Sequence, residues 1–186
     1  MHFVKLVKGK EKRYNFFVVK QKGKILRRRK RFQKEKIQID QSGKVEQTNK
    51  ITIVAFSNGK SGSVKLRAKD KRYLQSIYQQ AEKPKMFSLQ VFAALLYLLL
   101  EKFKIQSTMV IIDKEYPGHE TLIKSYIMQL VRKRGKLKLP TDYIRFELVG
   151  KSSNAHGVAS KAFKNNRADF TVDTEDVLAH ILLYEK

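Results

Sequence analysis

Short apolar runs dominate the first part of the chain and predict β-strands there. Residues 2–8 and 13–20 are rich in β-branched and aromatic side chains and are separated by a turn at Gly9, which predicts a hairpin. Asn58-Gly59 lies between two further runs and is typical of a tight hairpin turn. The further strands are expected over about 24–32, 37–40, 51–56 and 64–68.

Helical spacing of apolar residues begins after residue 68. It predicts helices over 70–82, about 89–103, 121–134 and 177–184, with a shorter one that ends near 164. The helix near 89–103 is apolar on nearly all sides, and its uncharged stretch of 15 residues, Met86–Leu100, is shorter than the roughly 20 residues that span a membrane. It is therefore expected to be a buried core helix.

Two more strands are expected among these helices, over 108–113 and 143–149. The whole order predicts one domain, 1–186, of the α/β (α+β) class, with a mixed β-sheet flanked by helices and extra N-terminal β-hairpins. A basic β-rich domain over 1–68 followed by an α/β domain over 69–186 is the alternative.

Positive charge changes this picture most. The 186 residues include 40 Lys and Arg against 17 Asp and Glu, a formal net charge of +23. Residues 1–50 hold 17 basic and 4 acidic side chains, whereas residues 140–186 hold 6 and 7. A globular chain with this charge is expected to bind a polyanion, and nucleic acid, either DNA or RNA, is the predicted partner.

Cysteine is absent, which excludes disulfides, a cysteine nucleophile and a cysteine-ligated zinc site. The N-terminal residues lack the long apolar core of a signal peptide. A cytoplasmic protein without a membrane partner is the expectation.

Basic side chains that could contact phosphates fall into several groups. Five are consecutive in a predicted strand, where neighbours point to opposite faces, so this segment is either a solvated edge or a phosphate-binding arm. They are Arg27, Arg28, Arg29, Lys30 and Arg31. The other candidates are Lys65, Arg67, Arg132, Lys133, Arg134 and Lys151.

Carboxylates that could act in catalysis gather in the second half of the chain. Asp113 follows a run of apolar residues, and a carboxylate at a strand end is costly unless it is paired or bound. Together with Asp169 it could bind Mg²⁺ or Mn²⁺ for phosphodiester hydrolysis, with His156 and Asp173 as further catalytic candidates. Asp173 could instead cap a helix, and His156 could be a half-buried, hydrogen-bonded residue.

The element order and two short motifs resemble the ribonuclease H-like superfamily. The motifs are YIRFELVGK at 143–151 and NNRAD at 165–169, which look like the last strand of that family and the start of its final helix. The resemblance implies that Asp113 is the acid at the end of the fourth strand, Asp169 the acid of the last helix and His156 the loop histidine.

Two acids of the family pattern are missing where they are expected. The family carries an Asp in its first strand, and residues 3–8 contain none. It carries a Glu in its first helix, where Met86–Leu100 offers only Ser88 and Gln90. The predicted function is therefore a nucleic-acid-binding protein of ribonuclease H-like type, and a metal-dependent nuclease with an incomplete site if it is an enzyme. The alternatives are a non-catalytic nucleic-acid-binding accessory protein and a basic protein–protein adaptor.

Overall fold

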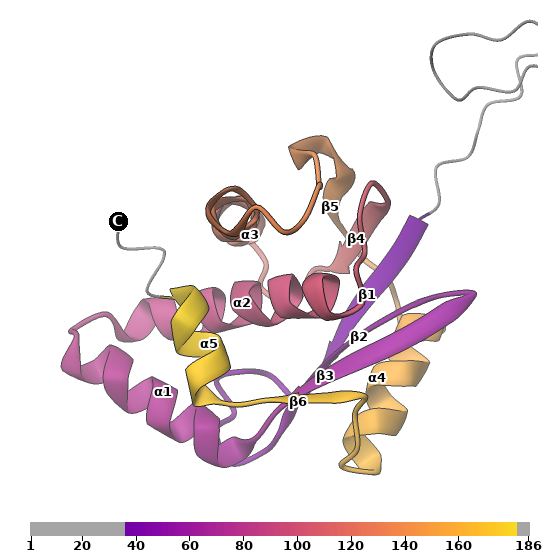
Figure 1. Cartoon of the computed structure of the whole chain (residues 1–186). Coiled ribbons are helices and arrows are strands. Elements are labelled where there is room, and N and C mark those ends of the chain that lie inside the picture. The colour runs from indigo at the N-terminus through magenta and orange to yellow at the C-terminus, as the bar shows by residue number, and fades with distance from the viewer. Residues whose placement is uncertain (1–35, 182–186) are drawn as a thin grey trace, which may run out of the picture. The chain divides into compact units, whose positions relative to one another are not determined.

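A six-stranded mixed sheet forms the centre of the structure, a computed structural model that describes residues 36–181 (Figure 1). The strand order across the sheet is β5-β4-β1-β2-β3-β6. The strands are β1 (Lys36–Ser42), β2 (Thr52–Asn58), β3 (Lys60–Leu66), β4 (Met109–Asp113), β5 (Ile144–Glu147) and β6 (Phe170–Val172).

Only β2 opposes the direction of the other strands. It pairs antiparallel with β1 and β3, whereas β4 is parallel to β1, β5 is parallel to β4 and β6 is parallel to β3. The hairpin between β2 and β3 turns at Gly59, as the Asn-Gly pattern predicts. The carboxyl ends of β1, β4 and β5 consequently lie at one edge of the sheet.

Helices cover both faces of this sheet. The α-helices are α1 (Ala68–Gln80), α2 (Phe87–Lys102), α3 (Glu120–Arg134), α4 (Asn154–Lys164) and α5 (Thr174–Ile181). Two 3₁₀ turns, Pro84–Met86 and Thr141–Tyr143, precede α2 and β5. Helices α2 and α3 share the main core with one face, and α4 packs on β1, β2 and β3 from the other face.

The central helix is α2, whose apolar surface meets the sheet on one side and other helices elsewhere. Every residue of the stretch 91–100 is buried, because the helix contacts β2, β3, α1, α3 and α5. The segment Pro84–Lys102 is long and apolar enough to cross a membrane by length and composition, but most of it is buried inside the protein. This burial agrees with the core helix expected from the sequence.

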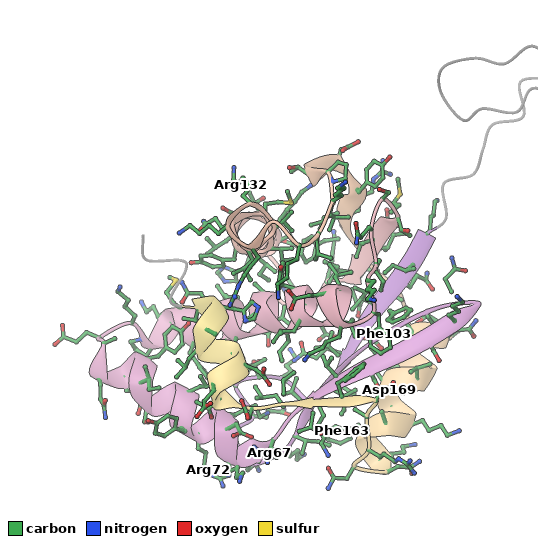
Figure 2. All side chains as sticks on the ribbon, viewed as in Figure 1. Arg67, Arg72, Phe103, Arg132, Phe163 and Asp169 are labelled. Carbon is green, nitrogen blue, oxygen red and sulfur yellow. The ribbon has the colours of Figure 1, made fainter. Side chains whose placement is uncertain are left out.

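Two glycines allow aromatic rings to lie directly against the sheet (Figure 2). A Cβ atom at Gly43, where φ is +75°, would lie 2.5 Å from the ring of Phe163 on α4. A Cβ atom at Gly62 in β3 would lie 2.3 Å from the ring of Phe103. Both distances are far below van der Waals contact, so larger residues at these positions would displace the rings.

The α/β class and the mixed sheet predicted from the sequence are confirmed, and the described elements lie within a few residues of their predicted positions. Strand β6 was not predicted, because three residues are too few for a periodic pattern. The strands expected before residue 33 lie outside the described residues. The single domain over 1–186 stays a prediction, although β1 to β3 belong to the same sheet as β4 to β6.

A buried lysine holds the loop that follows β1. Lys71 on α1 is fully buried, and its Nζ donates to the carbonyl oxygens of Lys44 (2.9 Å) and Gln47 (2.8 Å) and to Thr52 Oγ1 (2.9 Å). Burial lowers the pKa of Lys71 to about 8, so the ammonium group keeps its proton at neutral pH. Its three protons satisfy three acceptors that the fold removes from water.

Replacing this lysine tests whether it organises the loop. Lys71→Met keeps most of the volume and removes the three donors, which leaves buried acceptors without a partner. We expect the free energy of unfolding to fall by about 2 kcal/mol or more in urea titrations. Lys69→Met, at an exposed position of the same helix, is the control and should change it by less than about 0.5 kcal/mol. Equal effects of the two variants would contradict the role of Lys71.

Candidate metal centre

Two aspartates leave neighbouring parallel strands side by side. Ile39 of β1 pairs with Ile112 of β4, so the next residues, Asp40 and Asp113, lie next to each other. Asp113 is the last residue of β4, and Asp40 lies two residues before the end of β1, so both are near the carboxyl ends of parallel strands. The side chain of Asp40 is only 4% exposed, and Asp113 is half-buried. The pairing of β1 with β4 therefore brings together two acids that are 73 positions apart in the sequence.

A third carboxylate completes the cluster. Glu115, in the loop after β4, offers an oxygen that lies within 4.8 Å of ligand oxygens of Asp40 and Asp113. Glu147 pairs with Asp113 in the register of β4 and β5 and is exposed beside the cluster. Oxygen ligands at this spacing, from three acids, are the set that Mg²⁺ and Mn²⁺ prefer.

Backbone hydrogen bonds fix the orientation of both aspartates. The amide of Gln41 donates to Asp40 Oδ1 (2.8 Å), and the amide of Val149, just beyond β5, donates to Asp113 Oδ1 (2.8 Å). Each carboxylate therefore keeps lone pairs for a cation while its rotation is restrained. Such preorganisation is what a metal site requires of its ligands.

His156 connects the opposite face of the sheet to this cluster. Its Nδ1 lies 2.7 Å from Asp40 Oδ2, and its side chain is 37% exposed. The position of His156 follows from α4, which begins at the cap Ser153, whose Oγ accepts a hydrogen bond from the His156 amide (3.1 Å). The sequence prediction of a half-buried, hydrogen-bonded histidine is thus confirmed, and its partner is an acid of the cluster.

Burial and the neighbouring acids raise the pKa of Glu115. Burial, first, and then the nearby Asp40 and Asp113 raise its pKa from 4.5 to about 7, and a hydrogen bond with Asp40 adds to this shift. Lys44 opposes the shift. Without a cation, three closely spaced acids therefore retain a proton at neutral pH, as expected of carboxylates that share one site.

Tyr116 joins the loops that carry the acids. Its hydroxyl donates to Glu46 Oε2 (3.0 Å) and accepts from the amide of Val45 (3.4 Å), both in the loop after β1. Its ring packs on Phe92 of α2, with Lys44 Nζ above it at 5.9 Å from the centroid. The loop after Asp40 is thereby tied to the loop that contains Glu115.

Asp169 lies far from Asp113. Its Oδ2 accepts hydrogen bonds from the amide and the hydroxyl of Ser63, both at 2.8 Å, at the start of β6. Four strand spacings separate β6 from β4, about 19 Å. The structure does not bring these two predicted ligands together, and Asp169 instead joins β6 to β3 (Figure 2).

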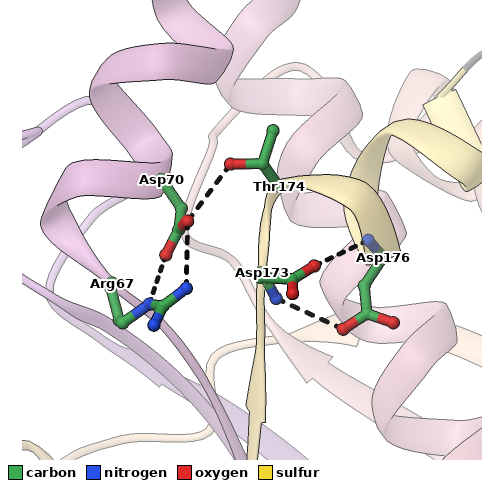
Figure 3. A network of polar contacts seen from close by, with 5 residues as sticks. All are labelled: Arg67, Asp70, Asp173, Thr174 and Asp176. Atoms are coloured by element: carbon green, nitrogen blue, oxygen red, sulfur yellow. Dashed lines mark hydrogen bonds and ion pairs between the residues drawn. The ribbon is translucent and has the colours of Figure 1, made fainter.

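Asp173 occupies a helix cap. The Asp176 amide donates to Asp173 Oδ1 (3.0 Å) and the Asp173 amide donates to Asp176 Oδ2 (3.2 Å), a reciprocal pattern at the start of α5 (Figure 3). Nearby, Asp70 accepts from Thr174 (3.1 Å) and pairs with Arg67 (2.6 Å). Asp173 is thus used in capping, the alternative that its sequence context favoured.

Some of the predicted phosphate-binding residues have partners within the fold. Arg67 is paired with Asp70, Lys65 Nζ donates to the Asn166 carbonyl (3.0 Å), and Arg134 Nη2 donates to the Ala179 carbonyl (2.8 Å). The exposed members are Arg132, Lys133 and Lys151. Arg27 to Arg31 lie outside the described residues, so their role stays a prediction.

Sequence reasoning missed Asp40 and Glu115. Asp40 lies two residues before the end of β1, in the pattern IQID. An acid near the end of a strand is also the signal that singled out Asp113 after MVII, but the first strand was sought at residues 3–8. Asp40 lies in β1, the first described strand. Glu115 lies a few residues before a predicted helix, where acids are common as helix caps, but α3 begins only at Glu120.

Comparison with models of known families, with curated proteins and with solved structures finds no match to this chain.

The raised pKa of Glu115 predicts a pH dependence of stability. A group that binds its proton more tightly when folded stabilises the fold below its unfolded pKa, near 4.5, and loses that contribution as the pH rises through about 7. The contribution is at most about 3 kcal/mol, and less because the group is partly exposed. Thermal unfolding of wild type and Glu115→Gln between pH 4.5 and 8 should show this loss in the wild type alone. Parallel profiles would contradict it.

Cation binding should show the opposite dependence on pH. A divalent ion competes with the proton of Glu115, so the rise in Tm caused by Mn²⁺ should grow up to about pH 7 and then level off. Asp40→Asn and Asp113→Asn should remove this rise, whereas Asp142→Asn, an exposed acid outside the cluster, should keep it. A Mn²⁺-induced rise that survives in both cluster variants would contradict the assignment.

Proposed function

We propose that the protein is a metal-dependent phosphodiesterase that cleaves nucleic acid, with its metal centre at Asp40, Asp113 and Glu115. The observation that carries this proposal is the convergence of three carboxylates at the ends of two parallel strands in a chain of net charge +23. Like charges held this close are unfavourable unless a cation binds them. The net positive charge of the chain would attract a polyanionic substrate.

The ligand set fits a hard divalent cation. Its three acids offer oxygen atoms alone, which suits Mg²⁺ or Mn²⁺ better than zinc. When bound, such ions lower the pKa of a water molecule and neutralise charge on the phosphate. Asp40, Asp113 and Glu115 would hold such an ion.

The residues around the cluster would supply position and proton transfer. His156 would hold Asp40 through Nδ1 and leave Nε2 to exchange a proton with water or with the leaving oxygen of the phosphodiester. The amides of Gln41 and Val149 would keep both aspartates aimed at the cation during the reaction.

The strand order supports the resemblance to the ribonuclease H-like superfamily on which the proposal partly rests. Strands β1 to β3 form a meander, and β4 and β5 are added beside β1. The first strand of this sheet carries Asp40, and the fourth carries Asp113. In this alignment of elements α4 is the final helix, and it contributes His156 where the sequence comparison proposed Asp169.

Non-catalytic binding is the second candidate. Its support is that α2 carries no acid before Glu101, which pairs with Lys136 (3.1 Å) instead of facing the cluster. A protein of this kind would bind nucleic acid through its basic side chains without hydrolysing it.

Cleavage assays separate the two candidates. End-labelled DNA and RNA oligonucleotides, single-stranded, duplex and hybrid, would be incubated with Mn²⁺, and binding would be measured separately in Ca²⁺. We expect Asp40→Asn and Asp113→Asn to reduce cleavage on the order of 100-fold or more with little loss of binding. Asp169→Asn and Asp142→Asn should retain cleavage.

Two outcomes would contradict the proposal. Cleavage that persists in both cluster variants would show that the catalytic centre lies elsewhere. Binding of every substrate without Mn²⁺-dependent cleavage would favour the non-catalytic candidate.

A further inference from the structure

A groove of about 940 Å³ runs between α3 and the edge strand β5. Its cations are Lys114, Lys124, Arg132 and Arg145, and its acids are Glu120 and Glu147. Apolar side chains of Ile144, Phe146 and Met128 also line it. A polar rim over an apolar floor with an excess of positive charge suits a partner that carries both phosphates and rings.

One end of this groove reaches the metal centre. Lys114 stands in the chain between Asp113 and Glu115, and Glu147 pairs with Asp113 across β4 and β5. Helix α3 begins at Glu120, and the lining residue Arg132 lies in its last turn (Figure 2). From Glu120 to Arg132 the helix rises about 18 Å, long enough for several nucleotides.

The cations of the groove are largely available to a ligand. Arg132 and Arg145 are exposed, and neither side chain has a hydrogen bond or ion pair within residues 36–181. Lys124 Nζ donates to the Ile144 carbonyl (2.8 Å), which orients it over β5 and leaves two protons for an acceptor. Lys124 and Arg132 come from α3 and Arg145 from β5, so guanidinium and ammonium groups line both sides of the groove, where they could contact the phosphates of a strand.

Apolar groups favour an unpaired strand over a duplex. Phe146 is half-buried on the groove floor, where a base could stack on it. Leu148, which follows Glu147 at the end nearer the cluster, is 83% exposed. A duplex keeps its bases inside, whereas a single strand can present both bases and phosphates to such a groove.

An added peptide strand fits the groove less well. Strand β5 has only four residues, and Lys124 already occupies the carbonyl oxygen of Ile144. Few backbone groups remain for β-augmentation, and the charge favours an anion.

We propose that the α3–β5 groove binds an unpaired segment of the nucleic-acid substrate and leads its backbone to the Asp40, Asp113 and Glu115 cluster. This inference rests on the proposed function for the identity of the ligand. It adds the form of the substrate, single-stranded at the site of cleavage, and the path by which the strand enters.

Charge reversal in the full-length protein tests the groove. The variant R132E/R145E would be compared with K161E/R167E, which changes two exposed cations on α4 and the turn after it by the same charge. Binding of labelled 12-nucleotide dT and U strands and of a blunt duplex would be followed by fluorescence anisotropy in Ca²⁺ at several salt concentrations. The dT and U arms separate a DNA from an RNA ligand.

The groove variant should bind single strands at least 10-fold more weakly. Its slope of log K against log salt should fall by about 1.4, the value for two lost phosphate contacts on a single strand. The control variant K161E/R167E should lose less than half as much single-strand affinity, and its salt slope should fall by less than half as much. Leu148→Ser should weaken single-strand binding while leaving duplex binding unchanged.

Equal losses in the groove and control variants would overturn the inference, because binding would then follow overall charge. Duplex binding that is as tight as single-strand binding and equally sensitive to R132E/R145E would also overturn it. These results differ from failure of the proposed function, which would be absence of Mn²⁺-dependent cleavage while groove-dependent binding persists.

Discussion

The parallel pairing of β1 with β4 is the constraint on which the rest of the structure depends. It sets Asp40 beside Asp113, and it requires the intervening chain to cross over one face of the sheet as α1 and α2. The apolar surface of α2 stabilises that crossover, because the helix is buried along almost its whole length. Burial of this apolar surface stabilises the pairing of β1 with β4 and so offsets the repulsion between the neighbouring acids.

Several contacts show how the fold keeps the acids in place. The amide of Gln41 donates to Asp40, and the amide of Val149 donates to Asp113. His156 contacts the other oxygen of Asp40 from α4. Lys71 and Tyr116 hold the loop after β1, and Tyr116 also links it to the loop of Glu115. The acids therefore belong to a connected structure that could accept a cation with little rearrangement.

The sequence predicted the elements well where apolar periodicity was long, as in α2 and α3, and at the Asn58-Gly59 hairpin. It predicted Asp113 because a carboxylate after a buried strand needs a partner. It did not identify that partner, since the register of β1 against β4 follows from the whole sheet and from no local pattern. Asp169 was paired with Asp113 by analogy of motifs, whereas the strand order separates them. Glu115 lay too close to a helix start for its role to be distinguished from a cap.

The most direct test of the central claim is a crystal structure of the protein soaked with Mn²⁺ and measured for anomalous scattering. The account predicts at least one anomalous peak at about 2 Å from carboxylate oxygens of Asp40 and Asp113, a distance typical of small divalent ions. Glu115 should then lie in or next to the coordination sphere. Anomalous peaks elsewhere, with an empty cluster of acids at saturating Mn²⁺ and neutral pH, would contradict it.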